Sequence, residues 1–383
     1  MIVNTSIVDQ VLNLAIAIQQ IPAPPFDEGR RAEFVHRKFL DEGLLEVNKD
    51  SLGNVFARLP GEGKMPPLVV TAHLDTVFPE TTDLSTIQKG DKIFGPGIGD
   101  NALGVAGLFG LLWSLQYQKA KSYGKEENKS TLPKMPGDLW LVANVGEEGL
   151  GNLRGMRAVV DRFGKNPLAY LVLEGMALGQ IYHRALGVQR FRITIDTAGG
   201  HSWVNFGDPS AVNELAVLIT QLNKIPAHNQ PRSTLNVGVI KGGTSVNSIA
   251  SNAFLELDLR SEDRSTLTNL ANQVTTLIEK AAKPEVQISL EEIGHRPAGE
   301  LPSPHQLILI ATRRFKEHGI QPNLTIGSTD ANIPLSLGLP SICFGLSTGS
   351  GAHTLNEYIN TKPLAKGLSA FERIVSDIYA GQI

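Results

Sequence analysis

The sequence predicts an α/β protein of about two domains, in which one domain is inserted into the other. Its 383 residues exceed the usual size of one domain, and its 38 glycines suit a fold with many tight strand-to-helix turns. Short apolar runs bounded by Gly and Pro alternate with helical periodicity, which is typical of a parallel or mixed sheet covered on both faces. Residues 185–296 instead follow the order β-α-β-β-α-β, which predicts a ferredoxin-like domain.

The first domain begins with two predicted helices. Apolar positions recur at helical spacing in VLNLAIAI and in RRAEFVHRKFL, and IPAPPFDEG separates the two segments. Four runs then predict buried strands, namely NVFARL, PLVVTAH, DLWLVANVG and LAYLVLEG. Helices are expected over residues 101–118 and 153–163. The polar, lysine-rich stretch over residues 119–137 predicts a solvated surface loop.

The inserted domain has longer strands of alternating polarity. VQRFRITIDT precedes a predicted helix over residues 209–224, the strands TLNVGVI and NAFLELDLR precede a helix over 263–283, and VQISLEEI follows. The chain then returns to the first domain with a helix over 304–318, the strand PSICFGL and a helix over 363–379. The predicted boundaries are 1–184 and 297–383 for the first domain and 185–296 for the insert.

Composition argues against several classes of protein. The 35 basic and 38 acidic side chains give a net charge of -3 without a basic stripe, so no nucleic-acid partner is expected. The single cysteine, Cys343, cannot form an internal disulfide. The N-terminal segment carries Asp9 within its apolar stretch and lacks the basic region of a signal peptide. The most apolar helical stretch, 104–115, falls short of the roughly 20 residues that span a membrane, so a cytoplasmic protein is expected.

Acidic and histidine side chains follow three of the predicted strands. Ligands of open α/β sheets bind at the carboxyl ends of strands, so these side chains are expected to meet at one edge. Each has a structural interpretation by itself, as an N-cap, a solvated turn or a core histidine. Together they predict a metal site, because buried carboxylates cost free energy unless they are paired or coordinated. They are His73 and Asp75 after the first strand, Glu147 and Glu148 after the second, Glu174 ending the third, Asp100 at a helix start and His353 in a late loop.

Two other motif matches are weak. Residues 97–102 fit the glycine pattern of a dinucleotide-binding loop, but Asp100 would face the pyrophosphate, and lysines stand where a ribose-binding acid is expected. Residues 345–349 fit the serine-hydrolase elbow, but GSGAHT follows where a helix should begin. Six further histidines are interpreted as structural: His36, His183, His228, His295, His305 and His318.

Six ordered segments resemble the dinuclear zinc peptidases and deacylases, a family that includes acetylornithine deacetylase, succinyl-diaminopimelate desuccinylase, aminoacylase, glutamate-releasing carboxypeptidases and peptidase T. The segments extend over essentially the whole chain: TAHLDTV, GPGIGDNALGVAG, NVGEEGLGNLRG, VLEG, GGHSW and GSTDAN…GAHTLNEYI. The resemblance implies a mixed-sheet catalytic domain built from both ends of the chain, with the ferredoxin-like insert as a lid and dimerisation domain. It also implies a homodimer.

The resemblance further implies two divalent metal ions per chain. Zinc suits imidazole and carboxylate ligands, with cobalt or manganese as substitutes. Asp75 would orient His73, and Glu147 would act as general base on a water that bridges the two ions. One ion would be held by His73, Glu174 and Asp100, and the other by Glu148, His353 and the second oxygen of Asp100.

Three residues of the insert match substrate-binding positions of the family. His201, in GGHSW, would stabilise the tetrahedral oxyanion, typically by reaching across from the partner subunit. Asn247, in GGTSVNSIAS, and Arg260, in LELDLR, would contact substrate. Arginine suits a free carboxylate on the substrate, because its fork binds a carboxylate through two hydrogen bonds. The alternative for Arg260 is a surface strand residue.

The expected activity is hydrolysis of an amide bond in a small peptide or N-acyl amino acid. Glu174, where peptidase T has aspartate, favours a carboxypeptidase or deacylase, whereas GSTDAN favours the alternative of a peptidase T-like tripeptide aminopeptidase. Two other classes stay open. One is a catalytically inactive binding or structural dimer on the same scaffold, and the other is a cofactor-dependent oxidoreductase.

Overall fold

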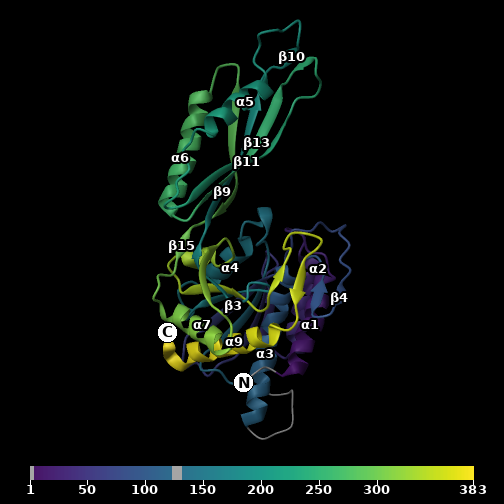
Figure 1. Cartoon of the computed structure of the whole chain (residues 1–383), viewed down its shortest axis with the longest axis vertical. Coiled ribbons are helices and arrows are strands. Elements are labelled where there is room, and N and C mark those ends of the chain that lie inside the picture. The colour runs from purple at the N-terminus through teal and green to yellow at the C-terminus, as the bar shows by residue number, and fades with distance from the viewer. Residues whose placement is uncertain (1–3, 123–131) are drawn as a thin grey trace. The chain divides into compact units, whose positions relative to one another are not determined.

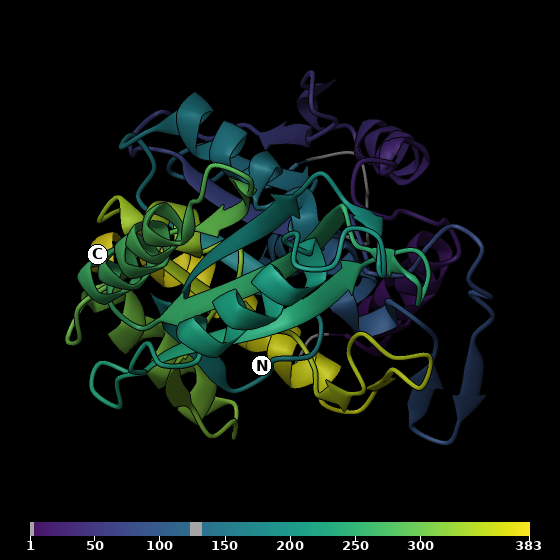
Figure 2. The ribbon, with the colours of Figure 1, turned by 90° about the horizontal axis from the view of Figure 1, so that it is seen from above.

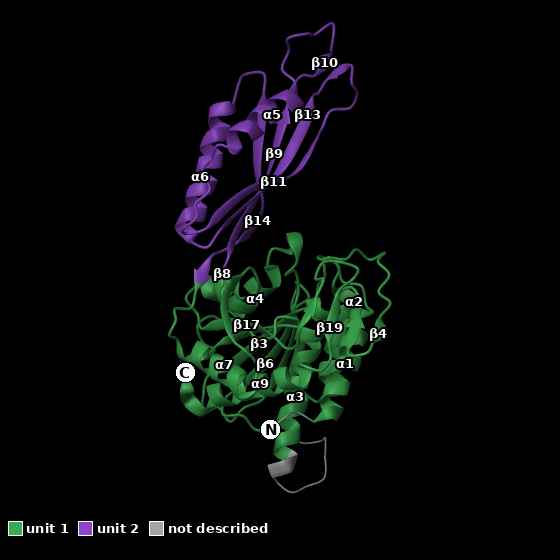
Figure 3. Ribbon diagram, in the orientation of Figure 1, with its two compact units in different colours: residues 1–184, 300–383 green, residues 185–299 purple. Residues whose placement is uncertain are grey.

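The computed structural model describes residues 4–122 and 132–383, which divide into two compact units (Figure 3). Unit 1 is formed by two stretches of chain, one that ends at Arg184 and one that begins at Glu300. Unit 2 is the continuous stretch Ala185–Gly299.

A nine-stranded mixed sheet forms the centre of the described part of unit 1 (Figure 1). Its strands are β1 (Leu45–Lys49), β2 (Val55–Leu59), β3 (Leu68–His73), β6 (Leu139–Asn144), β7 (Tyr170–Glu174), β8 (Gln180–Ala185), β15 (Gly299–Glu300), β16 (Asn323–Gly327) and β17 (Ser341–Gly345). The order is β1-β2-β6-β3-β7-β17-β8-β15, with β16 paired to β8. The four central strands β6, β3, β7 and β17 are parallel. They are buried along almost their whole length, because helices and loops cover both faces.

Helix α3 is the core helix of unit 1. It packs against α1, α9 and β3, and its Phe109 stacks on Phe39 of α2 with ring centroids 4.6 Å apart. A small sheet with the order β18-β19-β5-β4 completes the unit. The helices are α1 (Thr5–Gln19), α2 (Gly29–Asp41), α3 (Leu103–Ser122), α4 (Arg154–Phe163), α7 (Gln306–Glu317), α8 (Asn332–Ser336) and α9 (Leu364–Asp377), and the small strands are β4 (Ile87–Lys89), β5 (Lys92–Phe94), β18 (Gly349–Ser350) and β19 (Tyr358–Asn360).

The segment Ile98–Lys119 corrects two expectations about α3. At 22 residues it is longer than the predicted apolar stretch, and it is the one segment of the described chain that is long and apolar enough to cross a membrane. However, 89% of its apolar window is buried within the protein, as in a core helix. The helix also continues through Lys119 to Ser122, where a loop was expected. The prediction of a loop over residues 123–131 falls outside the described residues.

Unit 2 contains the elements β9 (Gly187–Asp196), β10 (Gly200–His201), α5 (Ala211–Leu222), β11 (Ser233–Gly242), β12 (Ser248–Ile249), β13 (Asn252–Ser261), α6 (Arg264–Ala281) and β14 (Gln287–Arg296). Its main sheet is antiparallel and has the order β11-β13-β9-β14. Both helices pack on β9 and β13, on the same face of this sheet (Figures 1 and 2). Alternate residues of β13, such as Leu255 and Leu257, are buried beneath them, and the residues between point to the other face.

Candidate metal centre

The strand ends bring the predicted ligands to one edge of the sheet in unit 1. His73 ends β3 and pairs with Asn144, the last residue of β6. Glu174 ends β7 and pairs with Gly345, the last residue of β17. Because these four strands are parallel, the segments that follow them leave the sheet at the same edge. Glu147 and Glu148 lie in the segment after β6, and His353 lies after β17.

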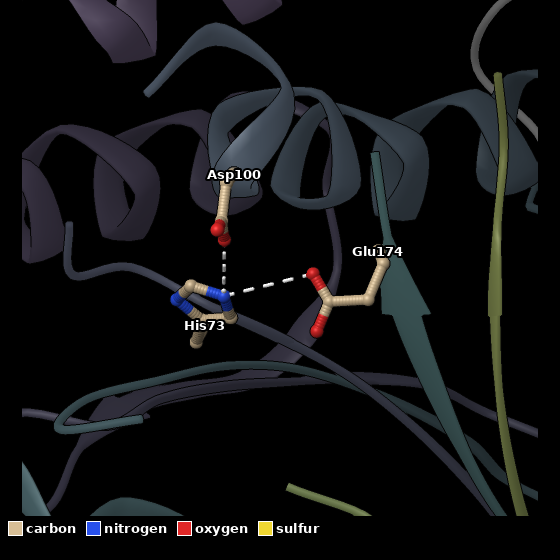
Figure 4. A group of neighbouring side chains, drawn as sticks. All are labelled: His73, Asp100 and Glu174. Carbon is tan, nitrogen blue, oxygen red and sulfur yellow. Dashed lines mark ion pairs between the residues drawn. The ribbon is translucent and has the colours of Figure 1, made fainter. Parts of the chain in front are cut away.

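One ring nitrogen of His73 faces two carboxylates (Figure 4). Its Nε2 atom is 3.2 Å from Asp100 Oδ1 and 3.7 Å from Glu174 Oε2. Its Nδ1 atom is 3.0 Å from the backbone carbonyl oxygen of Asp75. A proton on Nδ1 donates to this carbonyl and leaves the Nε2 lone pair directed at the carboxylates, which is the tautomer that a metal-binding imidazole needs.

Asp100 offers one carboxylate oxygen to each of two histidines. Oδ1 faces His73, and Oδ2 is 3.2 Å from Nε2 of His353. The same Nε2 atom is 3.1 Å from Oε1 of Glu148. The sequence predicts that Asp100 begins a helix, and the structure shows that this prediction is wrong. Asp100 lies in an irregular turn, Ile98–Ala102, with φ −116° and ψ 84°, ahead of the first helical residue of α3.

Three overlapping groups of these side chains could each hold a metal ion, with donor atoms that all lie within 4.8 Å of one another. Imidazole nitrogens and carboxylate oxygens are donors that suit zinc and similar divalent ions. Three of the donor residues are largely removed from solvent, since His73, Glu147 and Glu148 are 2%, 6% and 5% exposed, whereas His353 is exposed. The groups are His73–Asp100–Glu174, His73–Glu147–Glu148 and Asp100–Glu148–His353.

The electrostatics of the cluster favour a cation. Burial and the negative charges of Asp100 and Asp330 raise the pKa of Glu174 to about 7, although His73 opposes the shift. Hydrogen bonds with Asp100 and Glu148 raise the pKa of the His353 imidazole to about 10. Burial disfavours the charged form of His73, yet Glu174, Asp100 and Asp75 raise its pKa well above the ordinary value. The cluster therefore attracts positive charge, and bound cations would displace these protons.

Asp75 ties two ligand-bearing segments together. It is fully buried, and its Oδ1 and Oδ2 atoms accept hydrogen bonds from the backbone N–H groups of Glu147 and Glu148, at 3.0 and 2.7 Å. Oδ1 also lies 3.5 Å from Nδ1 of His73. These contacts hold the pKa of Asp75 below its usual value despite burial. The buried guanidinium of Arg31 donates to the Leu74 carbonyl at 2.6 Å and supports the same segment from α2.

The structure adds three buried residues that the sequence did not single out. Glu357 accepts hydrogen bonds from the backbone N–H groups of Gly97, Gly99 and Asp100, at 2.7 to 2.8 Å, and so fixes the turn that carries Asp100. The Asn101 side chain bonds to the Leu173 carbonyl and the Gly175 N–H, which join this turn to the end of β7. Asp330 accepts a 2.7 Å hydrogen bond from Asn144. Glu357 lies in GAHTLNEYI and Asp330 lies in GSTDAN. Their place in these two segments was the only sequence feature that could have indicated a role for them.

Unit 2 places His201 and Asn247 together. His201 on β10 pairs with Ser248 of β12, and the N–H of Ser202 donates to the Asn247 carbonyl at 3.1 Å. Both His201 and Asn247 are exposed.

Arg260 lies elsewhere in unit 2. Asn252, the first residue of β13, is the end of this strand nearest Asn247 in the sequence. Arg260 is eight residues further along β13, or about 26 Å at the usual rise of a strand. Its Nε atom donates to Asp258 at 2.7 Å, as a surface strand residue would. Its contact with substrate stays a prediction.

The structure gives the residues of the two weak motif matches other surroundings. Asp100 of the 97–102 segment belongs to two of the groups that could hold a metal ion. Ser347 of the 345–349 segment is fully buried, donates to the Asn360 carbonyl, and is followed by strand β18, where an elbow requires a helix. Of the six histidines interpreted as structural, three contact backbone groups near helix or strand ends: His183, His305 and His318.

Sequence comparison identifies relatives along most of the chain. The model of peptidase family M20/M25/M40 matches residues 69–377. A Schizosaccharomyces pombe protein described as a peptidase M20 domain-containing protein is 25% identical, over 96% of this chain and 84% of its own. Acetylornithine deacetylase of Pectobacterium carotovorum is 26% identical, over 81% of this chain and 79% of its own.

Solved structures share the fold. A tripeptidase of Staphylococcus aureus superposes with a TM-score of 0.81 at 22% identity, over 99% of this chain and 100% of its own. A Bacillus subtilis protein described as a dinuclear metal-binding peptidase superposes with a TM-score of 0.68 at 15% identity, over 98% and 99% of the two chains. At these identities the likeness establishes the fold alone.

Proposed function

The chain belongs to peptidase family M20/M25/M40 and is a hydrolytic enzyme, and on that premise we propose that it uses two metal ions to cleave an amide bond in a small peptide or N-acyl amino acid. One observation carries the proposal. Asp100 directs one oxygen to His73 and the other to His353, which gives two neighbouring donor groups that share a carboxylate. Two-metal hydrolases use such a pair of adjacent sites.

The proposed ligands of each ion are taken from the groups of neighbouring donor side chains. When bound, the two ions would polarise the scissile carbonyl and lower the pKa of a water molecule. Zinc suits the donors, with cobalt or manganese as substitutes. The description of the Bacillus subtilis relative as dinuclear supports the stoichiometry. His73, Asp100 and Glu174 would hold one ion, and Asp100, Glu148 and His353 the other.

Glu147 is the proposed general base. Its carboxylate lies within 4.8 Å of donor atoms of His73 and Glu148, yet neither proposed ligand set needs it. Its backbone N–H is held by Asp75, so the position of the residue is fixed. Glu147 would take a proton from the attacking water and deliver it to the departing amine.

His201 is the proposed donor to the oxyanion of the transition state. Its Nδ1 atom accepts hydrogen bonds from the backbone N–H groups of Trp203 and Val204, at 3.2 and 3.4 Å. The ring proton of the neutral imidazole therefore sits on Nε2, which can donate to a developing negative charge. Asn247 beside it and Arg260 on β13 are proposed substrate contacts.

Unit 2 is proposed to act as a ferredoxin-like lid and dimerisation domain, in a homodimer. Its strand order and the placement of both helices on one face support the ferredoxin-like description. In a dimer, His201 would serve the substrate from its own or the partner chain.

The proposed substrate preference rests on Glu174, which would touch the metal beside the substrate. Glu174 favours a deacylase or carboxypeptidase, in line with the Pectobacterium relative, which is an acetylornithine deacetylase. The alternative is a peptidase T-like tripeptide aminopeptidase. The GSTDAN segment favours it through its resemblance to peptidase T.

Metal analysis combined with a substrate panel tests the proposal. The panel holds dipeptides, tripeptides and N-acyl amino acids, assayed with and without a chelator. We expect about two ions per chain, activity that disappears with the chelator, and recovery on adding zinc. No bound metal after zinc reconstitution would contradict the dinuclear enzyme and favour an inactive binding dimer. Cleavage that requires a free α-amino group and ignores the C-terminus would replace the deacylase or carboxypeptidase preference with the aminopeptidase.

A further inference from the structure

Large apolar side chains follow His201 in the chain of unit 2 or lie in the segment paired with it, and they are exposed. Trp203 is 86% exposed, Phe206 is 90% exposed, and Val204 and Val246 are 76% and 103% exposed. Soluble proteins rarely expose such side chains side by side without a ligand or partner. The two other tryptophans of the chain, Trp113 and Trp140, are shielded to a much greater degree.

Hydrogen bonds hold these side chains on a defined loop. The Asn205 side chain accepts from the His201 N–H at 3.0 Å, and the Asn205 N–H donates to the His201 carbonyl at 2.9 Å. The Ser202 N–H donates to the Asn247 carbonyl. Val246 precedes Asn247, so this bond places the segment that carries Val246 beside the loop that carries Trp203 and Phe206. The apolar groups and the two polar groups, His201 and Asn247, therefore belong to one local surface.

We propose that Trp203, Phe206 and Val246 form an apolar specificity surface, which receives a hydrophobic side chain on a residue that flanks the scissile bond. The inference rests on the proposed role of His201. If Nε2 of His201 approaches the oxyanion to about 3 Å, then Trp203 and Phe206, two and five residues further along the chain, would meet the groups attached to the carbon that bears the oxyanion. An apolar lining with a few directed polar groups is typical of a ligand site, and aromatic rings supply large contact areas.

The experiment measures kcat/KM on matched substrate pairs. Within each pair, glycine replaces leucine or phenylalanine, either on the acyl side or on the amine side of the scissile bond. The variants are Trp203→Ala and Phe206→Ala. The matched control is Val217→Ala, which removes a 54% exposed apolar side chain from α5 in the same unit. We expect each test variant to lose about 10- to 100-fold in kcat/KM on the apolar member of one pair. The glycine member should change little, and the control should match the wild type on both.

A second readout follows Trp203 directly. An uncleavable analogue with the preferred apolar side chain should protect an exposed tryptophan from iodide quenching in the wild type, and Trp203→Phe should remove that component. The glycine analogue should protect it less.

The outcomes separate the surface from the proposed function. One outcome is that the wild type cleaves the substrates while the variants lose kcat/KM equally on both members of every pair, or lose none. That result overturns the specificity surface and leaves the proposed hydrolase in place. Equal losses accompanied by dissociation of an oligomer, measured by sedimentation, would show that a second copy of the chain occupies the surface instead. If the wild type, loaded with metal, cleaves neither member of any pair, then the hydrolase and the surface both fail.

Discussion

The carboxylate of Asp75 accepts a 2.7 Å hydrogen bond from the backbone N–H of Glu148. Its other oxygen accepts from the N–H of Glu147 and lies 3.5 Å from Nδ1 of His73. One buried side chain therefore sets the spacing between the end of β3 and the segment that carries the proposed base and a ligand. Asp75 therefore supports the geometry of the candidate metal centre, even though it is not a ligand in the proposed sets.

Asp75→Asn should weaken metal binding. An asparagine can accept through its carbonyl oxygen, but its NH₂ group would face a backbone N–H donor, so one of the two hydrogen bonds is lost. We expect metal affinity to fall 10- to 100-fold, as for other groups that orient ligands. Competition with a chromophoric chelator measures it. Asp83→Asn, at an exposed loop position that accepts from the Ser85 N–H, is the control. Unchanged affinity in Asp75→Asn would contradict the orienting role.

Glu147→Gln should retain metal and lose turnover. The amide cannot accept the proton, so kcat at full metal occupancy should fall by roughly 10²- to 10⁴-fold. Glu148→Gln is the comparison, because it alters a proposed ligand and should lower metal content. Elemental analysis of both variants beside kcat separates the two roles. A kcat close to that of the wild type in Glu147→Gln removes this residue as the base.

The position of the proposed ligands at the strand ends was predictable because its signal is local. An apolar run followed at once by His73, Glu174 or the Glu147–Glu148 pair places an acid or imidazole at the carboxyl end of a strand. Strands without an apolar run were missed. β1 (Leu45–Lys49) is mostly exposed at the edge of the sheet, and β4 (Ile87–Lys89) is fully exposed, so neither carries a burial pattern.

The support of the ligands was not predictable, because it depends on contacts between distant parts of the chain. Glu357 binds the backbone of the Asp100 turn across more than 250 positions, and hydrogen bonds to backbone N–H groups leave no periodic trace in a sequence. The same holds for the turn itself, which delays the start of α3 to Leu103. Trp203 lies in the GGHSW segment, but its exposure follows only from the folded loop.

Asp377→Asn should destabilise unit 1 in a pH-dependent way. Asp377 on α9 accepts from Nε of Arg314 at 2.6 Å and from Nη2 of Arg313 at 2.7 Å, which joins α9 to α7. Burial alone would raise the pKa of Asp377, but the two arginines hold it below its usual value. A carboxylate whose pKa is lowered by folding stabilises the protein above its unfolded pKa of about 3.9. That stabilisation is lost as the pH falls through the lower folded pKa.

Urea unfolding at several pH values checks the Asp377 prediction. The variant should lose about 2 kcal/mol at pH 7, the size expected for charged hydrogen bonds at a largely buried carboxylate. The difference from the wild type should shrink below about pH 4, where the carboxyl protonates first in the unfolded chain and, at lower pH, in the folded protein. Asp161→Asn, at an exposed position of α4, is the control. A difference that is constant from pH 7 to pH 3 would point to packing as the cause.

Gly175→Ala should disturb the metal centre without altering a ligand. A Cβ atom at Gly175 would lie 2.2 Å from the Gly99 carbonyl oxygen and 2.8 Å from the Leu103 Cβ. These atoms belong to the backbone beside Asp100 and to the start of α3, so they cannot swing aside as the end of a flexible side chain could. The substitution must push the Asp100 turn away from β7, at a cost of about 1–3 kcal/mol.

The expected result for Gly175→Ala is a lower melting temperature, weaker zinc binding and a smaller rise in melting temperature on adding zinc. Gly29→Ala is the control, because no atom lies within 4 Å of the added Cβ at the start of α2. Calorimetry with and without zinc measures both effects. A variant that melts earlier but keeps the full zinc-dependent rise would show that the close approach of Gly175 to Gly99 serves stability alone. The position of the Asp100 carboxylate would then depend on Glu357 and Asn101 instead.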